Sequence, residues 1–491
     1  MVVKQRKSFN LYFILLVVVV MFGCFNNKKS SKSGDAEIVV ISTNDMHAQI
    51  SQFPKFATFV KETREKFPNV ILVDAGDRFS GSPFVDHAKE RGKPMIELMN
   101  KVGYNLATMG NHDFDYGQTV LRKRLSEAQF KVIGANIRSD GSELGQLPPY
   151  LFVEEAGIKL CFLSFIEISP TSHIPATNPE HLEGITFADF KGEADTYRKL
   201  KDECNAFIGL THLGVYADSV LAAIMPELDV IIGGHSHTLL KEPKMVNGVM
   251  ISQTGSRLHY AGVTVLKFEK GKLTDKSYHV VDLANIETPD AEVAAMIESY
   301  SNDPDFKVVV GKAAEPMKYK ENVASLVTDA MADRAECDFA FYNSGGIRLN
   351  TIPAGDITKG MIYQIEPFDN YVVKHELSLP EMKALVLNRF NSETSNEYRR
   401  VDLFISKGSY TILRDKTGKG VDVVFKDKNG RKLNEGRRYK IGLSNYVSTT
   451  YDFSGKGKGE KSLSITEAVM QYLQKAGPVV YNKKRTFINP K

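Results

Sequence analysis

Short apolar runs that alternate with helical stretches dominate the first half of this 491-residue chain. The runs are almost continuously apolar, which is typical of strands buried on both faces of an α/β sheet. Most of the runs end in Gly, Asn or His. The clearest runs cover residues 38–43, 70–76, 106–111, 160–165, 206–212 and 229–235. We therefore expect an α/β domain over residues 37–283.

A second unit is expected from residue 307 to residue 491, because the chain is too long for one ordinary domain. The break at Asn302-Asp303-Pro304 ends a helical stretch and predicts a connector over residues 284–306. Beyond the connector, a helix is expected near residues 324–334. Apolar and β-rich stretches follow it, which favours a smaller α/β or α+β domain.

The first 23 residues read as an export signal. Lys4, Arg6 and Lys7 precede an apolar run over residues 11–22. This run is shorter than the roughly 20 residues that span a bilayer, so a signal peptide is the better interpretation. We therefore predict that the protein is exported.

A lipid anchor is predicted at Cys24, because a cysteine after Gly23 with a polar stretch behind it resembles a bacterial lipoprotein signal. Met21 and Phe22 are bulkier than that pattern usually carries, so plain secretion is the alternative. Residues 24–36 would then be a flexible tether. The expected location is the cell envelope, either periplasmic or at the cell surface.

The net charge argues against a nucleic acid polymer as partner. The formal value is +4, and three positive charges belong to the predicted signal, so the remainder is close to +1. A nearly neutral chain lacks the basic field that such polymers require. Beyond Cys24, Cys161, Cys204 and Cys337 have no metal-ligand spacing and read as buried apolar residues.

Five of the strand-like segments end in metal-ligand residues. They are Asp45-Met46-His47, Gly76-Asp77, Gly110-Asn111-His112-Asp113, Thr211-His212 and Gly233-Gly234-His235-Ser236-His237. Ligands collect at the carboxyl ends of strands in α/β folds. Asp, Asn and His together suit Zn, Mn or Fe better than Ca or Mg. The pairs Asp45/His47 and His235/His237 are each spaced i, i+2. In extended backbone this spacing places both side chains on one face, so we expect both to converge on a metal.

Each segment alone has a simpler reading, namely a polar residue at the end of a strand. The remaining histidines are read as structural residues: His87, His173, His181, His259, His279 and His375. Five such segments in one order are hard to explain by chance, and a metal site is the better interpretation.

The order D-x-H, G-D, G-N-H-D, H and G-H-x-H resembles the calcineurin-like metallophosphoesterases. With the second unit included, the mature chain resembles the 5′-nucleotidase/UDP-sugar hydrolase family. The resemblance implies a four-layer α-β-β-α domain followed by a smaller substrate-binding domain. It also implies a hydrolase in which water attacks the phosphorus in line, without a Ser or Cys nucleophile.

The resemblance implies two divalent metal ions, with Zn or Mn the best fit to the ligands. Asp45, His47, Asp77 and His237 would hold one ion. Asp77, Asn111, His212 and His235 would hold the other, with Asp77 bridging. Two ions about 4 Å apart clamp a phosphoryl group, acidify a water and stabilise developing charge.

His112 resembles the catalytic histidine of the family, placed to donate to a phosphoryl oxygen. The family places its aspartate four residues after the asparagine, which favours Asp115 over Asp113 as its partner. Asp115 would orient the imidazole and keep it cationic.

In the second unit, residues 343–348 (NSGGIR) follow an apolar strand. Paired glycines let a ligand approach the backbone, and Arg348 offers a bidentate fork for phosphate; a tight turn is the alternative. The segment resembles the family motif whose Asn and Arg contact substrate, which implies binding roles for Asn343 and Arg348. Residues 366–370 (EPFDN) resemble P-F-G-N, so Phe368 would stack on a nucleobase, an interaction worth about 1–3 kcal/mol.

Two positions depart from the family pattern. Lys320 stands where the family often has another phosphate-binding Arg, and it keeps the charge but loses the fork. The Gly-rich loop before the second stacking aromatic is missing from residues 445–453. Either Tyr451 or Phe453 is expected to complete the clamp. These departures bear on substrate choice and leave the metal chemistry intact.

The predicted function is therefore removal of the 5′-phosphate from nucleoside monophosphates. Hydrolysis of UDP-sugars or 2′,3′-cyclic nucleotides with the same site is the alternative. A non-catalytic surface binding protein is a more distant alternative, because no predicted ligand is missing and His112 is present. A purely carbohydrate-binding protein is disfavoured, because the chain has no Trp to stack on sugars.

Overall fold

The structure, a computed structural model, describes residues 34–170, 172–392, 400–453, 457 and 459–489. The predicted signal peptide, Cys24 and most of the tether lie outside these residues. Within the described ranges, no helix combines the length and apolar character needed to cross a membrane.

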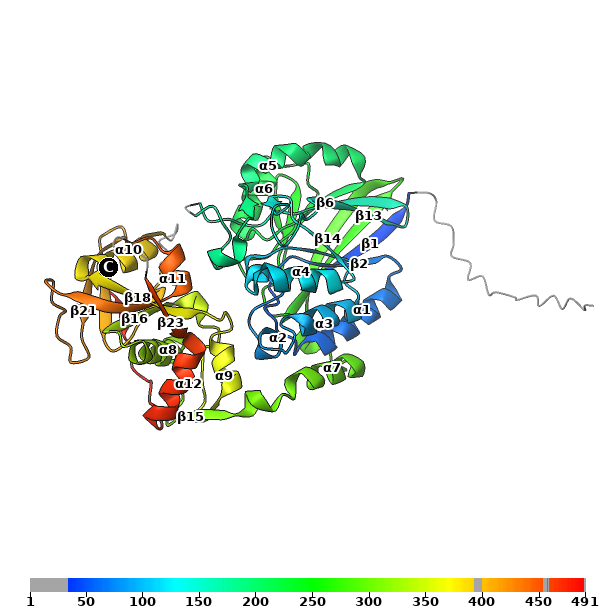
Figure 1. Cartoon of the computed structure of the whole chain (residues 1–491). Helices are drawn as coiled ribbons and strands as arrows, with labels where there is room; N and C mark the ends of the chain where they lie inside the picture. The colour runs from blue at the N-terminus through cyan, green and yellow to red at the C-terminus, as the bar shows by residue number, and fades with distance from the viewer. Residues whose placement is uncertain (1–33, 171, 393–399, 454–456, 458, 490–491) are drawn as a thin grey trace, which may run out of the picture.

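Two six-stranded sheets organise the described part of the N-terminal domain (Figure 1). The first has the order β14-β13-β1-β2-β3-β4: β1 (Ala36–Thr43), β2 (Val70–Asp74), β3 (Leu106–Thr108), β4 (Lys131–Ile133), β13 (Tyr260–Glu269) and β14 (Lys272–Asp282). The second has the order β11-β12-β10-β9-β7-β6: β6 (Tyr150–Glu155), β7 (Ile158–Leu163), β9 (Ala206–Leu210), β10 (Val230–Ile232), β11 (Lys244–Val246) and β12 (Val249–Ser252). The central strands of both run parallel, so their carboxyl ends share one edge.

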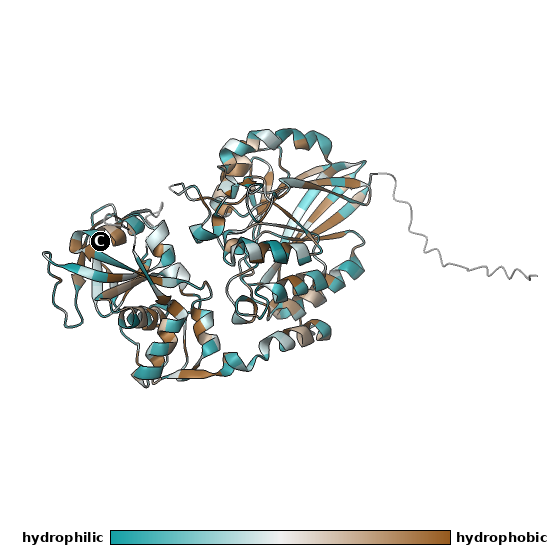
Figure 2. Cartoon of the chain, in the orientation of Figure 1, coloured by the Kyte–Doolittle hydropathy of each residue, from teal (hydrophilic) through white to brown (hydrophobic). Residues whose placement is uncertain are grey.

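The sheets pack face to face, and helices cover their outer faces. In β1, Ile38 and Val40 lie in the core between the sheets, whereas Val39 and Ile41 pack against the helices outside. The apolar strands therefore lie in the interior of the layers (Figure 2). The helices of this domain are α1 (Phe53–Lys66), α2 (Pro83–Asp86), α3 (Lys93–Val102), α4 (Gly117–Glu127), α5 (Phe190–Tyr197) and α6 (Val215–Ile224). The predicted four-layer α-β-β-α arrangement is confirmed.

The chain passes between the domains along α7 (Ala291–Ser301) and a short 3-10 turn at Pro304–Lys307. Figure 1 shows α7 beneath the N-terminal domain, leading to β15 (Val309–Ala313). Asp290 caps α7 by accepting a hydrogen bond from Val293 N at 3.0 Å. The stretch predicted as connector, residues 284–306, includes α7 and most of this turn.

The C-terminal domain is smaller and mixes helices with short sheets. Its main sheet has the order β19-β16-β22-β18-β23: β16 (Phe339–Asn343), β18 (Tyr371–Ser378), β19 (Leu403–Ile405), β22 (Arg438–Ser444) and β23 (Glu460–Ser464). Smaller sheets contain β15 with β17 (Gly355–Thr358), and β20 (Ser409–Arg414), β21 (Gly420–Lys426) and β24 (Thr486–Ile488). The helices are α8 (Lys320–Arg334), α9 (Lys359–Ile365), α10 (Leu379–Ser392), α11 (Asn445–Thr450) and α12 (Ile465–Ala476).

The domains touch around the loop that follows α9. Arg91 forms an ion pair with Asp369, and its Nη2 donates to Pro367 O at 3.3 Å. The rings of His87 and Tyr363 stack with centroids 3.7 Å apart. These contacts form the interface between the two domains, here called the seam. The strand ends of the N-terminal domain face the C-terminal domain across it.

Candidate functional site

The five predicted ligand segments converge at one edge of the N-terminal domain. They follow β1, β2, β3, β9 and β10, and each begins directly after its strand or within a few residues of it. Because β1, β2 and β3 run parallel to one another in one sheet and β9 and β10 do so in the other, the segments follow carboxyl ends of strands and meet at the edge predicted from the sequence. Five of the seven predicted ligands are buried; His235 is partly buried and the His237 side chain is 40% exposed.

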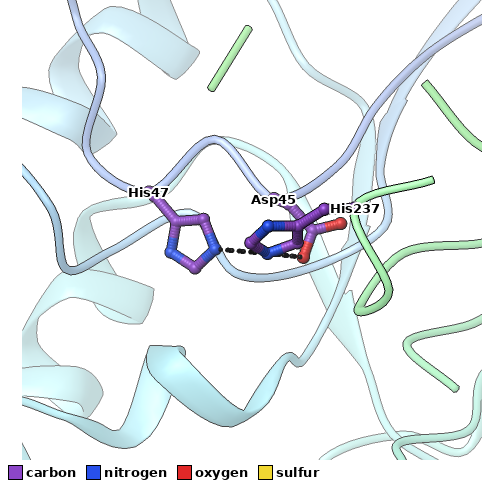
Figure 3. Close-up of side chains that lie close together, drawn as sticks. All are labelled: Asp45, His47 and His237. Atoms are coloured by element: carbon purple, nitrogen blue, oxygen red, sulfur yellow. Dashed lines mark hydrogen bonds and ion pairs between the residues drawn. The ribbon is translucent and has the colours of Figure 1, made fainter. Parts of the chain in front are cut away.

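Asp45, His47 and His237 form a first group (Figure 3). His47 Nε2 lies 2.9 Å from His237 Nε2, which lies 3.3 Å from Asp45 Oδ1. Figure 3 shows the two imidazoles and the carboxylate directed toward one another. His47 Nε2 is also 3.8 Å from Asp77 Oδ2, which connects this group to a second one.

The second group contains Asp77 and His212, whose Oδ2 and Nε2 atoms are 3.2 Å apart. The ring of His235 lies edge-on to that of His212, with centroids 5.1 Å apart. His235 Nδ1 is 3.0 Å from Asn111 Oδ1. The structure therefore brings all seven predicted ligands together, with Asp77 between the two groups.

The backbone of these ligands differs from the extended conformation that we expected for the i, i+2 pairs. Asp45, His47, Asp77, His235 and His237 all have positive φ angles between 47° and 80°. Left-handed backbone is unfavourable for residues other than Gly, and such strain concentrates at functional sites. As a result, His237 joins the first group while His235 faces the second.

The donor set fits divalent transition metal ions. Imidazole nitrogens, carboxylates and an amide oxygen are ligands that Zn and Mn accept. His212 Nδ1 lies 2.7 Å from Ala75 O, which directs Nε2 at the carboxylates and is the arrangement of metal-bound histidines. Against the effect of burial, Asp77 and Asp45 raise the pKa of His212 to about 10. The negative charge of these two carboxylates therefore favours a bound cation at this position.

His112 and Asp115 form the predicted dyad. His112 Nδ1 lies 2.7 Å from Asp115 Oδ2, and the His112 backbone N–H donates to Asp77 Oδ1 at 2.8 Å. Burial opposes the charged imidazole, but Asp115 and Asp77 outweigh it and raise the pKa of His112. The cationic form suits donation to an anionic oxygen.

Asp113 has a different role from Asp115. Its carboxylate accepts backbone N–H groups from Gly110 at 2.8 Å, Arg78 at 3.0 Å and Asp77 at 3.2 Å. It therefore ties the loop after β2 to the loop after β3. The approach is so close that a Cβ atom on Gly110 would lie 2.2 Å from Asp77 Oδ1.

A cleft between the domains joins the metal-ligand residues to the predicted substrate residues. Asn343, Arg348 and Phe368 line it together with Asp77 and His112. Within the described part of the chain, buried Asn343 Oδ1 and Arg348 Nε have no hydrogen-bond partner, as expected of groups that await a ligand. The Phe368 ring stacks over His112 at 5.5 Å and lies 5.7 Å from the Arg348 guanidinium.

Lys320 lies beside the cleft rather than in its lining. Its Nζ donates to Ser344 O at 3.1 Å, within the turn between Asn343 and Arg348. Burial, and then the charge of Arg348, lower the pKa of Lys320 to about 8. In this structure Lys320 supports the turn.

The expected second aromatic is not where we predicted. Tyr451 hydrogen-bonds to Asp402, and both Tyr451 and Phe453 pack in the core of the C-terminal domain. Tyr446 lines the cleft instead. Without a Gly-rich loop, the chain enters α11 directly, with Ser444 as its N-cap. Tyr446 falls in the first turn of this helix, at the cleft.

Sequence reasoning also missed a segment of the N-terminal domain that lines the cleft. Ala176, Thr177, Asn178 and His181 belong to it, and His181 was read as structural. Asn370, after Phe368, lines the cleft as well. No motif marks the residues of the segment, because the hydrogen bonds that connect Ala176 to Asn111 and Thr177 to Asp115 each span more than 60 positions.

Two family profiles match the chain. The profile described as "Calcineurin-like phosphoesterase" matches residues 38–239, and "5′-nucleotidase, C-terminal domain" matches residues 309–453. The matched regions hold the metal-ligand segments and the predicted substrate residues respectively.

Similar proteins include the 5′-nucleotidase of Vibrio cholerae, 27% identical over 72% of this chain and 76% of its own length. Endonuclease YhcR of Bacillus subtilis is 26% identical over 87% of this chain, which spans 38% of that longer protein. The crystal structure of a 5′-nucleotidase precursor from Thermus thermophilus has the same fold, with a TM-score of 0.79 and 24% identity. That likeness covers 93% of this chain and all of the other.

Proposed function

Because this chain belongs to the 5′-nucleotidase family of calcineurin-like metallophosphoesterases, we propose that it removes the 5′-phosphate of nucleoside monophosphates. The observation that carries the proposal is the shared cleft. Its lining includes Asp77 and His112 at one end and the aromatic residues Phe368 and Tyr446 from the other domain. A phosphate and a base on one small molecule fit such a site.

Two divalent metal ions are proposed as cofactors. Asp45, His47 and His237 would hold one and His212, His235 and Asn111 the other, with Asp77 contributing to both. When bound, such ions supply Lewis acidity toward a phosphoryl group and make a water more acidic. The left-handed loops direct the ligand atoms toward one another, so little reorganisation would be needed to hold the ions.

The remaining chemistry belongs to side chains of the cleft. Cationic His112, held by Asp115, would donate a hydrogen bond to a phosphoryl oxygen as negative charge develops there. Arg348 would bind another phosphoryl oxygen, and its free Nε supports this role. Asn343 would accept or donate a hydrogen bond at the sugar end. Water attacks the phosphorus and the nucleoside leaves, so no covalent intermediate is required.

Phe368 is proposed to stack on the nucleobase, with Tyr446 as the second aromatic residue of the clamp. Both line the cleft, whereas Tyr451 and Phe453 are packed in the core. Base stacking on an aromatic side chain is worth about 1–3 kcal/mol. Phe368→Ala should therefore weaken nucleotide binding without removing any phosphate contact.

The decisive experiment measures phosphate release by the purified protein with Mn²⁺ or Zn²⁺. The substrates are AMP, UMP, UDP-glucose, 2′,3′-cyclic AMP and a simple aryl phosphate. A preference for AMP and UMP that Phe368→Ala abolishes supports the proposal. Turnover of only the cyclic or sugar-linked compounds would retain the metal site and refute the specificity.

Export and lipid anchoring through Cys24 are proposed from the sequence alone. The apolar run before Cys24 and the polar stretch after it support this proposal. Expression with a radiolabelled fatty acid should label the wild-type protein and not Cys24→Ser. A labelled Cys24→Ser protein, or an unlabelled wild-type protein in the soluble fraction, would contradict the anchor.

A further inference from the structure

Residues 176–180, here called the cleft segment, touch the catalytic residues from one side and the C-terminal domain from the other. The segment lies between β7 and β8 (Thr186–Phe187) and belongs to none of the five ligand loops. Three of its residues, Ala176, Thr177 and Asn178, line the cleft. None of them carries a charge, so their contribution must come through hydrogen bonds and shape.

Thr177 holds the carboxylate of the dyad. Its hydroxyl donates to Asp115 Oδ1 at 2.8 Å, while the other oxygen, Oδ2, lies 2.7 Å from His112 Nδ1. Thr177 is 2% exposed and Asp115 is 6% exposed, so water does not compete freely for these oxygens. With both oxygens engaged, the carboxylate cannot rotate away from the imidazole.

Ala176 performs a related task for a predicted metal ligand. Its carbonyl accepts a hydrogen bond from Asn111 Nδ2 at 3.0 Å. This bond identifies the nitrogen of the amide and leaves Asn111 Oδ1 facing His235, where a metal ion would need an oxygen. Two consecutive residues of the cleft segment therefore orient a metal ligand and the dyad.

The far end of the cleft segment is attached to the C-terminal domain. Glu180 Oε1 accepts a hydrogen bond from the Tyr371 hydroxyl at 2.9 Å. Tyr371 directly follows Asn370, which lines the cleft. The cleft segment thus connects the C-terminal domain, at Glu180, to the dyad, at Thr177.

We propose that Thr177 is a positioning residue for the reaction, which holds Asp115 and through it the imidazole of His112. The inference rests on the proposed function, because its effect is measured on turnover of a phosphate ester. Thr177 does not touch the substrate phosphate in this role. Its loss therefore lowers kcat and leaves KM nearly unchanged.

The test compares Thr177→Val, which removes the hydroxyl at nearly constant volume, with Thr177→Ser, which keeps it. Loss of such supporting contacts typically costs about 10- to 100-fold in activity. We expect kcat of Thr177→Val to fall about 10-fold or more on the best substrate, with KM within about twofold of the wild type. Thr177→Ser should recover most of the loss.

The matched control is Thr119→Val. Thr119 is an exposed threonine of α4 whose hydroxyl also bonds to a carboxylate, that of Glu143, away from the cleft. It should leave kcat unchanged. A second readout does not depend on activity: a crystal structure of Thr177→Val should show that Asp115 Oδ2 has moved beyond hydrogen-bond distance of His112 Nδ1. If Thr177→Val does not fold, Thr177→Ala removes the same donor and takes its place.

Wild-type kcat in the folded Thr177→Val or Thr177→Ala protein overturns the inference. So does a loss of kcat that Thr177→Ser fails to rescue, or one that is accompanied by loss of bound metal. A wild-type protein that hydrolyses none of the phosphate esters overturns the proposed function instead, so the two failures are distinguishable.

Discussion

At the residue scale, the charge states of a few buried side chains set how the site responds to pH. Glu366 is one of them, two residues before Phe368. Its Oε1 accepts hydrogen bonds from Phe368 N at 2.9 Å and Asn370 Nδ2 at 3.1 Å. Burial nevertheless dominates and raises the pKa of Glu366 to about 8. Below that pH, the carboxyl group that accepts these hydrogen bonds from the Phe368 loop is therefore neutral.

This raised pKa predicts a stability that falls as pH rises. Between the unfolded value near 4.5 and the folded value near 8, the folded protein keeps a proton that the unfolded chain releases. The free energy of unfolding then decreases with pH in this window, by at most about 1.4 kcal/mol per pH unit. Glu366→Gln should flatten the dependence of Tm on pH between pH 5 and pH 8. An unchanged slope would contradict the assigned pKa.

His112 should be the side chain of the dyad whose loss costs most. His112→Ala removes the donor to the phosphoryl oxygen and should lower kcat by at least about 10²-fold. His279→Ala, on the exposed side of β14, is the control and should have wild-type kcat. Steady-state kinetics with AMP and an aryl phosphate measure both variants. Near-normal turnover by His112→Ala would remove this histidine from the mechanism.

At the scale of elements, the site depends on how closely the loops after β2 and β3 approach each other. A Cβ atom on Gly110 would lie 2.4 Å from Asp77 N and 2.2 Å from Asp77 Oδ1. Neither atom can give way, because the N–H donates to Asp113 and the oxygen accepts from His112 N. The glycine is therefore required by the separation of the two loops.

Gly110→Ala should displace Asp77 and weaken metal binding at both groups. We expect kcat to fall by at least about 10²-fold, a scale that a displacement of about 1 Å can produce. Gly141→Ala is the matched control, since a Cβ atom there meets nothing within 4 Å. Metal content after dialysis and kcat are the measurements. Full metal occupancy and wild-type turnover in Gly110→Ala would show that the loops separate easily.

The sequence predicts the buried strands of the N-terminal domain well and the backbone conformation of the loops after them less well. Strands were identified because β1, β2, β3, β7, β9 and β10 are apolar on both faces, a local property. Ligands at the ends of parallel strands then had to meet. The positive φ angles of Asp45 and His235 could not be read in the same way. Asp and His are enriched among residues with positive φ, but most Asp and His residues do not adopt it, so the residue type alone does not locate such a turn.

The misplaced aromatic residue has a similar cause. The family pattern puts it at the end of residues 445–453, but Ser444 begins a helix in this chain and brings Tyr446 to the cleft. The cleft segment was missed for a different reason. Its contacts to Asn111 and Asp115 span more than 60 residues and are made by a carbonyl and a hydroxyl, which carry no sequence signature.

At the scale of the whole molecule, one ion pair connects the domain that holds the dyad to the loop that holds Phe368. Arg91 lies over the Tyr116 ring at 4.3 Å and reaches Asp369 and Pro367 across the seam. The pair is partly exposed, with Arg91 22% and Asp369 49% accessible, so its net contribution is small. Because Pro367 and Asp369 flank Phe368, we expect the pair to help keep Phe368 near His112.

Arg91→Ala and Asp369→Ala should each raise KM for AMP by roughly two- to fivefold, and the double variant should show no further increase. KM for an aryl phosphate should stay within about twofold of the wild type, because that substrate has no base. The control is Arg122→Ala, outside the cleft lining. Equal effects on both substrates, or fully additive effects, would argue against a link between the pair and base binding.

The origin of the two halves of the cleft has a consequence for how such proteins diversify. Every predicted metal ligand lies between Asp45 and His237, and the base and sugar contacts proposed from the cleft lining lie between Asn343 and Tyr446. Substitutions in the later stretch can therefore retarget the enzyme to another leaving group without rebuilding the reactive centre. A library of variants confined to cleft-lining positions of the C-terminal domain would vary substrate specificity and leave the predicted metal ligands and the dyad unchanged.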